Sequence, residues 1–85
     1  PKYFNIYFNR ANVKYALKDY SGAINDYTKT IKEDSKHKNA YINRGIAKEA
    51  LKDTQGACSD WYLATKLGDA RSIKWIENEC KRLTK

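Results

Sequence analysis

Arginine and aspartate recur at matched positions in the two halves of this chain, and together they can form strong ion pairs. Arg10 and Asp26 return 34 residues later as Arg44 and Asp60. A guanidinium and a carboxylate fit each other through two parallel hydrogen bonds, and a charge removed from water is stable only when such a partner is present. We therefore predict structural ion pairs among these four residues, either within each half or between Asp26 and Arg44 of successive halves.

Cys58 and Cys80 form the second pair of residues with chemistry of their own. They lie about equally far from the turn residues Gly68 and Asp69, one before the turn and one after it. An antiparallel pair of helices therefore holds them at nearly the same height. A disulfide between them requires an oxidising, extracytoplasmic compartment. Two packed thiols in a cytoplasmic protein are the alternative, because free cysteine is commonly buried as a small apolar residue.

Residues for catalysis or metal binding do not converge in this sequence. The single histidine, His37, stands in a polar loop where we expect it to be solvated, with no acid or nucleophile to orient it. Glu77 and Glu79 are two apart and point in different directions from a helix. The 4 glycines are scattered, unlike those of a phosphate-binding loop, and two cysteines with a remote histidine do not make a zinc site. We predict a non-enzyme without cofactor or metal.

Helical spacing of the apolar residues predicts five helices that position these side chains. The first helix is expected at about 3–18, the third at about 38–52 and the fifth at about 70–83. The second helix is expected to end near residue 33 and the fourth near residue 67. Asp19 and Asp53 open two of the turns, where a carboxylate can accept hydrogen bonds from the first N–H groups of the next helix. Gly68 suits the left-handed position at a helix end, and Asp69 can cap the last helix.

The last predicted helix has one apolar side and one polar side, as the end of a stacked helical array requires. We expect its buried stripe to consist of Ile73, Ile76, Cys80 and Leu83. Trp75 falls opposite that stripe. It is either an exposed contact residue or folded against the helix at 38–52, and we favour the second because an exposed tryptophan is uncommon without a partner.

The 34-residue period extends well beyond the charged pairs, because residues 16–19 (Ala-Leu-Lys-Asp) return unchanged as residues 50–53. The pattern resembles the tetratricopeptide repeat, a helix–turn–helix unit of this length. The matching positions are Tyr7 and Tyr41, Ala11 and Gly45, Ala23 and Ala57, and Tyr27 and Trp61. The resemblance covers about residues 4–69. It departs from the family pattern at Arg10, Lys14 and Ser35 and at their counterparts Arg44, Lys48 and Asp69, where leucine, an aromatic residue and proline are usual.

This resemblance implies an all-α fold in a single domain over residues 1–85. Two helix–turn–helix units, at about 4–37 and 38–69, form a short right-handed α-solenoid that a capping helix closes at about 70–83. About three units are normally needed before such an array is stable. The chain starts at Pro1 and carries Tyr3, Phe4, Ile6, Tyr7 and Phe8 in its first helix. We therefore interpret it as an excised piece or a mature fragment, in which further repeats or a partner once covered that aromatic face.

In this family the first helices of the repeats line a groove that binds a peptide or a partner helix. Carried over residue by residue, the groove positions are Asn5, Phe8, Asn9, Asn12 and Tyr15 in the first repeat and Asn39, Ile42, Asn43, Ile46 and Glu49 in the second. Side-chain amides both donate and accept, so the asparagines can hold an extended peptide while Phe8, Ile42 and Ile46 supply apolar contact. The alternative is that these asparagines are ordinary surface residues. The family's clamp for a peptide C-terminus matches only at Asn12 and Asn43, so we predict none.

We therefore expect a non-catalytic scaffold that binds a protein or peptide. The formal charge of +7 raises a second hypothesis, binding of nucleic acid or another polyanion through Lys14, Lys18, Lys48 and Lys52. We rank it lower because base recognition relies on arginine, and here lysine dominates. A third hypothesis is self-association through the first helix. No apolar run reaches the roughly 18 residues that a membrane span needs, so we predict no membrane insertion.

Overall fold

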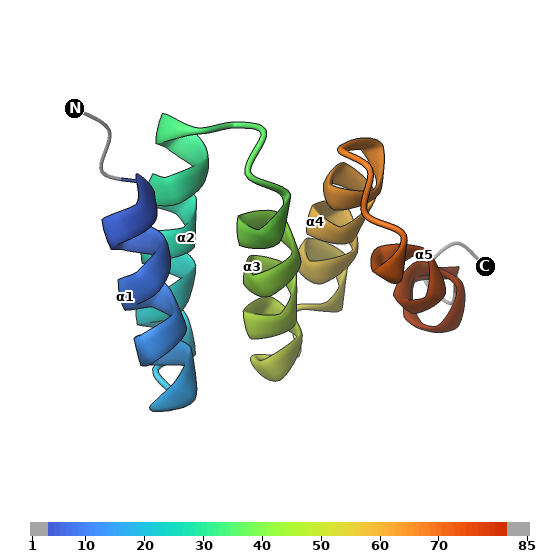
Figure 1. The fold of residues 1–85 in the computed structure, drawn as a ribbon. Helices are drawn as coiled ribbons and strands as arrows, with labels where there is room; N and C mark the ends of the chain where they lie inside the picture. The colour runs from blue at the N-terminus through green and yellow to red at the C-terminus, as the bar shows by residue number, and fades with distance from the viewer. Residues whose placement is uncertain (1–3, 82–85) are drawn as a thin grey trace.

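The computed structural model describes residues 4–81, and all of its regular structure is helical (Figure 1). The elements are α1 (Phe4–Ala16), α2 (Tyr20–Glu33), α3 (Lys38–Ala50), α4 (Thr54–Lys66), α5 (Arg71–Trp75) and the π-helical turn η1 (Ile76–Cys80). The predicted all-α fold with five helices is confirmed. The last helix differs from the prediction, because α5 passes into η1 instead of running on as a regular helix. The predicted end of that helix, Leu83, lies outside the described residues.

The helices stand side by side in chain order. α1 and α2 form one antiparallel hairpin and α3 and α4 a second (Figure 1), and the two hairpins meet where α2 packs on α3. α5 and η1 then cover α4. Each hairpin thus packs chiefly on its neighbour in sequence, which makes the molecule a linear stack.

Three helices end in the same way, with a left-handed residue followed by an aspartate. Lys18 and Lys52 have φ values of 65° and 66°, and Gly68 has 102°. In each case the next residue, an aspartate, donates its N–H to a carbonyl five residues back, at 2.8–3.0 Å. This six-to-one hydrogen bond closes the helix end. Glycine was predicted there at Gly68, whereas the two lysines adopt the left-handed conformation despite the cost of a side chain.

The aspartates that follow these left-handed residues cap the next helix. Asp19 and Asp53 each accept a hydrogen bond at 3.0 Å from the backbone N–H three residues on, and Asp69 accepts one at 2.8 Å from Ser72. These three caps agree with the sequence prediction. The cap of α3 was not foreseen: His37 Nδ1 accepts from the N–H of Ala40 at 3.2 Å. His37 is half-buried, and its ring lies 4.5 Å from that of Phe8, so the expectation of a solvated histidine was wrong.

Small residues at the helix crossings let aromatic side chains fill the core. Ala11, Ala23 and Ala40 are completely buried around Tyr27. In the second hairpin, Gly45 stands where the first has Ala11. A Cβ atom on Gly45 would lie 2.5 Å from the indole nitrogen of Trp61, so the larger tryptophan requires glycine at this crossing.

The terminal segment buries part of the predicted stripe. Ile76 and Cys80 are buried as predicted, together with Ser72, whereas Ile73 is 47% exposed. The three buried residues are four apart and come from α5 and η1. Trp75 is half-buried, with its ring 5.3 Å from that of Trp61. It also packs against the cluster that contains Tyr41 and Ile42 of α3, as we favoured.

Cys58 of α4 and Cys80 of η1 are joined by a disulfide, with their sulfur atoms 2.13 Å apart. Of the two states left open by the sequence, the structure therefore shows the bonded one. The bridge links the terminal segment to the second hairpin at a point where Ala57, Trp61 and Ile76 are also buried. Separately, none of the helices in the described residues combines the length and apolar character needed to cross a membrane.

Candidate functional site

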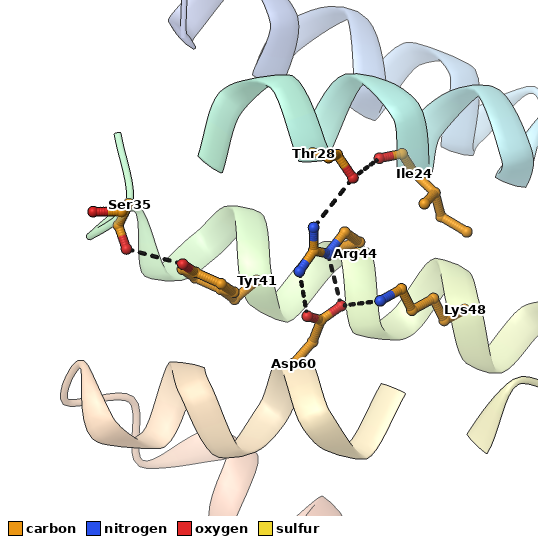
Figure 2. Close-up of polar contacts among 7 residues, drawn as sticks. All are labelled: Ile24, Thr28, Ser35, Tyr41, Arg44, Lys48 and Asp60. Carbon is orange, nitrogen blue, oxygen red and sulfur yellow. Dashed lines mark hydrogen bonds and ion pairs between the residues drawn. The ribbon is translucent and has the colours of Figure 1, made fainter. Parts of the chain in front are cut away.

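Each hairpin is held together by a bidentate ion pair between its two helices. Arg10 donates to Asp26 through Nε at 2.7 Å and Nη2 at 2.8 Å, and Arg44 donates to Asp60 at 2.9 Å and 2.6 Å through the same atoms. Figure 2 shows the second pair. Of the two pairings considered from the sequence, the structure has the one within each half. Arg44 also reaches the other hairpin, because its Nη1 donates to Thr28 of α2 at 3.1 Å.

A lysine joins each of these pairs from one turn further along the helix. Lys14 lies 3.2 Å from Asp26, and Lys48 lies 3.2 Å from Asp60. The hydrogen bonds from Arg10, with those from Lys14, hold the pKa of the Asp26 carboxyl below its usual value, against the opposing effect of burial. Two of the four lysines considered for polyanion binding are therefore engaged with carboxylates inside the fold.

The two hairpins also meet through a pair of asparagines that the sequence placed in the groove. Asn12 Oδ1 accepts hydrogen bonds from the hydroxyl of Tyr27 and from Nδ2 of Asn43, the latter at 3.2 Å. A cavity of about 320 Å³ opens beside them, lined by Asn12, Tyr15, Tyr27, Asn43 and Ile46. Four of these five residues, all but Tyr27, were predicted as groove positions, and they converge from α1 and α3 as expected.

Tyr27 lines this cavity and makes the fold sensitive to alkaline pH. Burial raises the pKa of Tyr27 to about 12. Since an unfolded tyrosine loses its proton near pH 10, the unfolded chain binds fewer protons than the folded chain between about pH 10 and 12. Stability is therefore expected to fall as pH rises through this window. Urea unfolding of the wild type and of Tyr27→Phe, at about pH 9 and about pH 11.5, measures this effect.

The Tyr27→Phe variant is expected to lose less stability between the two pH values than the wild type. Tyr62→Phe is the matched control, because Tyr62 is 47% exposed, and it should behave like the wild type. If Tyr27→Phe and Tyr62→Phe show the same pH dependence, the buried phenol is not responsible.

The other predicted groove residues are divided between the surface and the interior. Asn5, Asn9 and Asn39 are exposed, and Asn39 accepts a hydrogen bond from Arg71 at 3.3 Å. Ile42 is only 2% exposed. It cannot offer apolar contact to a ligand, because it packs with Tyr41 and Ala64 in the core.

Phe8 also differs from the prediction. It is half-buried and packs into the core beside Tyr27, with the two ring centroids 5.9 Å apart, and its other neighbour is the ring of His37. The loop between α2 and α3 thus folds over this position. Phe8 stabilises the junction of the two hairpins instead of serving as an open contact residue.

A second cavity, of about 460 Å³, lies where the second hairpin meets the terminal segment. Its lining residues are Ile46, Glu49, Trp61, Trp75, Asn78 and Glu79. Ile46 belongs to both cavities, so the two are adjacent. Sequence reasoning missed most of this lining because it considered only the first helix of each repeat, whereas Trp61 comes from α4 and the last three residues come from α5 and η1.

Within residues 4–81, no group of three or more His, Cys, Asp or Glu side chains is arranged to bind a metal ion. The candidate site is a pair of cavities lined by amide, aromatic and carboxylate groups. No model of a known protein family matches the chain, and no curated protein matches it in sequence.

Proposed function

We propose that this chain is a tetratricopeptide-type interaction module that binds an extended peptide or protein segment along α1 and α3. The observation that supports it most strongly is the convergence of Asn12, Asn43 and Ile46 on one cavity between the hairpins. Two helical hairpins related by a 34-residue repeat are the arrangement that such a module needs. Pockets for ligands are typically mostly apolar with a few polar groups that orient the ligand, and the aromatic, isoleucine and amide lining fits that description.

The amide pair provides the hydrogen-bonding groups for a peptide backbone. Asn12 Oδ1 accepts both the Tyr27 hydroxyl and one N–H of Asn43, which holds the two amides in a fixed orientation. Nδ2 of Asn12 and Oδ1 of Asn43 are then the donor and the acceptor for a peptide group. An amide pair ordered before binding loses little entropy when the ligand arrives.

Affinity capture with the immobilised chain tests this proposal. The captured segment is then made as a synthetic peptide, and its affinity is measured by titration calorimetry. Asn43→Ala is expected to weaken binding of that peptide about tenfold, since it removes an acceptor and releases Asn12. Asn25→Ala is the matched control, because Asn25 is exposed on α2 and lines neither cavity. Equal binding by the two variants would show that the amide pair is not the site.

Self-association is a second candidate, and one specific observation favours it. Ile6 and Val13 are exposed apolar residues of α1, and the exposed Leu17 follows the end of that helix. The counterparts of Ile6 and Val13 in the second hairpin, Ala40 and Ala47, are completely buried, whereas Leu51, the counterpart of Leu17, is 49% exposed. The positions of Ile6 and Val13 are thus covered in the second hairpin and open in the first. Light scattering over a concentration series separates the candidates, since a strict monomer at all concentrations excludes self-association.

Polyanion binding stays the weakest of the three proposals because Lys14 and Lys48 neutralise carboxylates inside the fold. Polyanion binding predicts an affinity that falls steeply as the salt concentration rises. Peptide binding through amide and apolar contacts should depend little on salt. We further infer that the module is non-catalytic. The Cys58–Cys80 bridge supports an oxidising compartment, where disulfides persist.

A further inference from the structure

The second cavity has a local charge opposite to that of the chain as a whole. The chain carries a formal charge of +7, yet both charged residues that line this cavity, Glu49 and Glu79, are acidic. Trp61 and Trp75 also line it, with their rings 5.3 Å apart at an angle of 49°. Tryptophan faces beside carboxylates are the combination that attracts organic cations.

Glu49 has a carboxylate oxygen that lacks a hydrogen-bond donor among the described residues. Its Oε1 atom is buried and has no hydrogen-bond partner within the described part of the chain. A buried carboxylate oxygen without a donor is costly. The indole nitrogen of Trp61, a residue that is 4% exposed, is packed against Gly45 at the helix crossing. The unsatisfied Glu49 oxygen, on a residue that lines the cavity, indicates a ligand that brings a hydrogen-bond donor.

We propose that this cavity binds the side chain of a lysine or arginine in the peptide that the module captures. The inference rests on the peptide-binding function proposed above and adds a chemical preference to it. Because Ile46 lines both cavities, a peptide held by Asn12 and Asn43 can extend into the second cavity. There the cation is placed between the Glu49 carboxylate and the half-buried Trp75 ring, and its N–H groups donate to that carboxylate.

The folded chain already contains contacts of this kind. The guanidinium of Arg44 lies 5.7 Å from the ring centroid of Tyr41 while its N–H groups bind Asp60. An arginine held jointly by an aromatic face and a carboxylate is therefore part of the structure. The cavity offers the same two groups to a cation from outside.

The experiment uses single amino acids as probes, so that it does not depend on capture of a whole peptide. N-acetyl-arginine amide and N-acetyl-lysine amide are titrated into the ¹⁵N-labelled chain, and the indole N–H signals of its 2 tryptophans report on the cavity. Both signals are expected to shift with the two cationic probes. N-acetyl-norleucine amide, which has an apolar stem without the charge, should leave them nearly unchanged.

Glu49→Gln keeps the shape of the side chain and removes its charge, and it is expected to weaken binding of the cationic probes about tenfold. Glu77→Gln is the matched control, because Glu77 is exposed on η1, lies outside the cavity lining and changes the net charge equally. If Glu49→Gln does not fold, as judged by circular dichroism, Glu79→Gln replaces it with the same expectation.

Two results would overturn the inference: norleucine amide binding as well as the cationic probes, or Glu77→Gln weakening binding as much as Glu49→Gln. The first would indicate a purely apolar cavity and the second a diffuse electrostatic effect. Failure of the peptide-binding function would be seen in a different experiment, in which the Asn43→Ala variant still binds the peptide normally. The two proposals can therefore fail independently.

Discussion

Asp60→Ala is expected to destabilise the fold by about 3 kcal/mol. The Asp60 side chain is 1% exposed and neutralises both Arg44 and Lys48, whose side chains are 15% and 21% exposed. Without the carboxylate, two positive charges stay close together within the second hairpin with little access to water. Because a domain of this size has a total stability of only about 5–10 kcal/mol, urea unfolding followed by circular dichroism should show a large decrease in the midpoint.

The equivalent pair in the first hairpin supplies the control for this experiment. Asp26 is buried as deeply as Asp60, but its partner Arg10 is 50% exposed, so water can solvate the guanidinium once the carboxylate is removed. Asp26→Ala should therefore cost less than half as much as Asp60→Ala. Equal losses in the two variants would show that burial of the cation does not determine the cost.

Loss of the Cys58–Cys80 bridge is expected to reduce the free energy of unfolding by about 3 kcal/mol, because the disulfide closes a loop between residues 22 apart. Urea unfolding is compared for the oxidised chain, the reduced chain and the Cys58→Ala/Cys80→Ala variant. Reduction keeps both sulfur atoms in place, so it measures the cross-link alone. The double variant adds the loss of packing and should be the least stable of the three.

The double variant also serves as the control for the reductant, because the unfolding midpoint of this variant should be the same with and without reductant. Identical midpoints for the oxidised and reduced wild type would contradict the prediction. In that case the packing of Ile76 and Trp75 alone would hold the terminal segment against the second hairpin.

Local features of the fold could be predicted from the sequence because they depend on residues close together in the chain. The caps at Asp19, Asp53 and Asp69 each involve an N–H three residues away, so the sequence alone contains both partners. The 34-residue repeat then showed that the two hairpins are alike. The ion pairs were predicted as a set, but their pairing was left open because Asp26 lies at similar sequence distances from Arg10 and Arg44.

Features that depend on contacts between distant segments could not be predicted. His37 was expected to be solvated, and only the position of Phe8, almost 30 residues earlier, shows why it is half-buried. Ile73 was assigned to the buried stripe with Ile76 and Cys80, but it lies on α5, before the π-helical turn, and is 47% exposed. Ile42 was assigned to the groove by its place in the repeat, but the terminal segment places Trp75 against the cluster to which it belongs.

The disulfide lies at one end of the stack, so the two ends of the molecule are held in different ways. Helices in a linear array lose their contacts by fraying from the ends, and here the end with Cys80 is tied covalently to α4. Within the described residues, α1 is held to α2 by non-covalent contacts such as the Arg10–Asp26 ion pair, so we expect it to open more readily than η1. Since Asn12 and Tyr15 belong to α1, a brief opening there dismantles the cavity between the hairpins, while the tryptophan-lined cavity, built from α3, α4, α5 and η1, stays assembled.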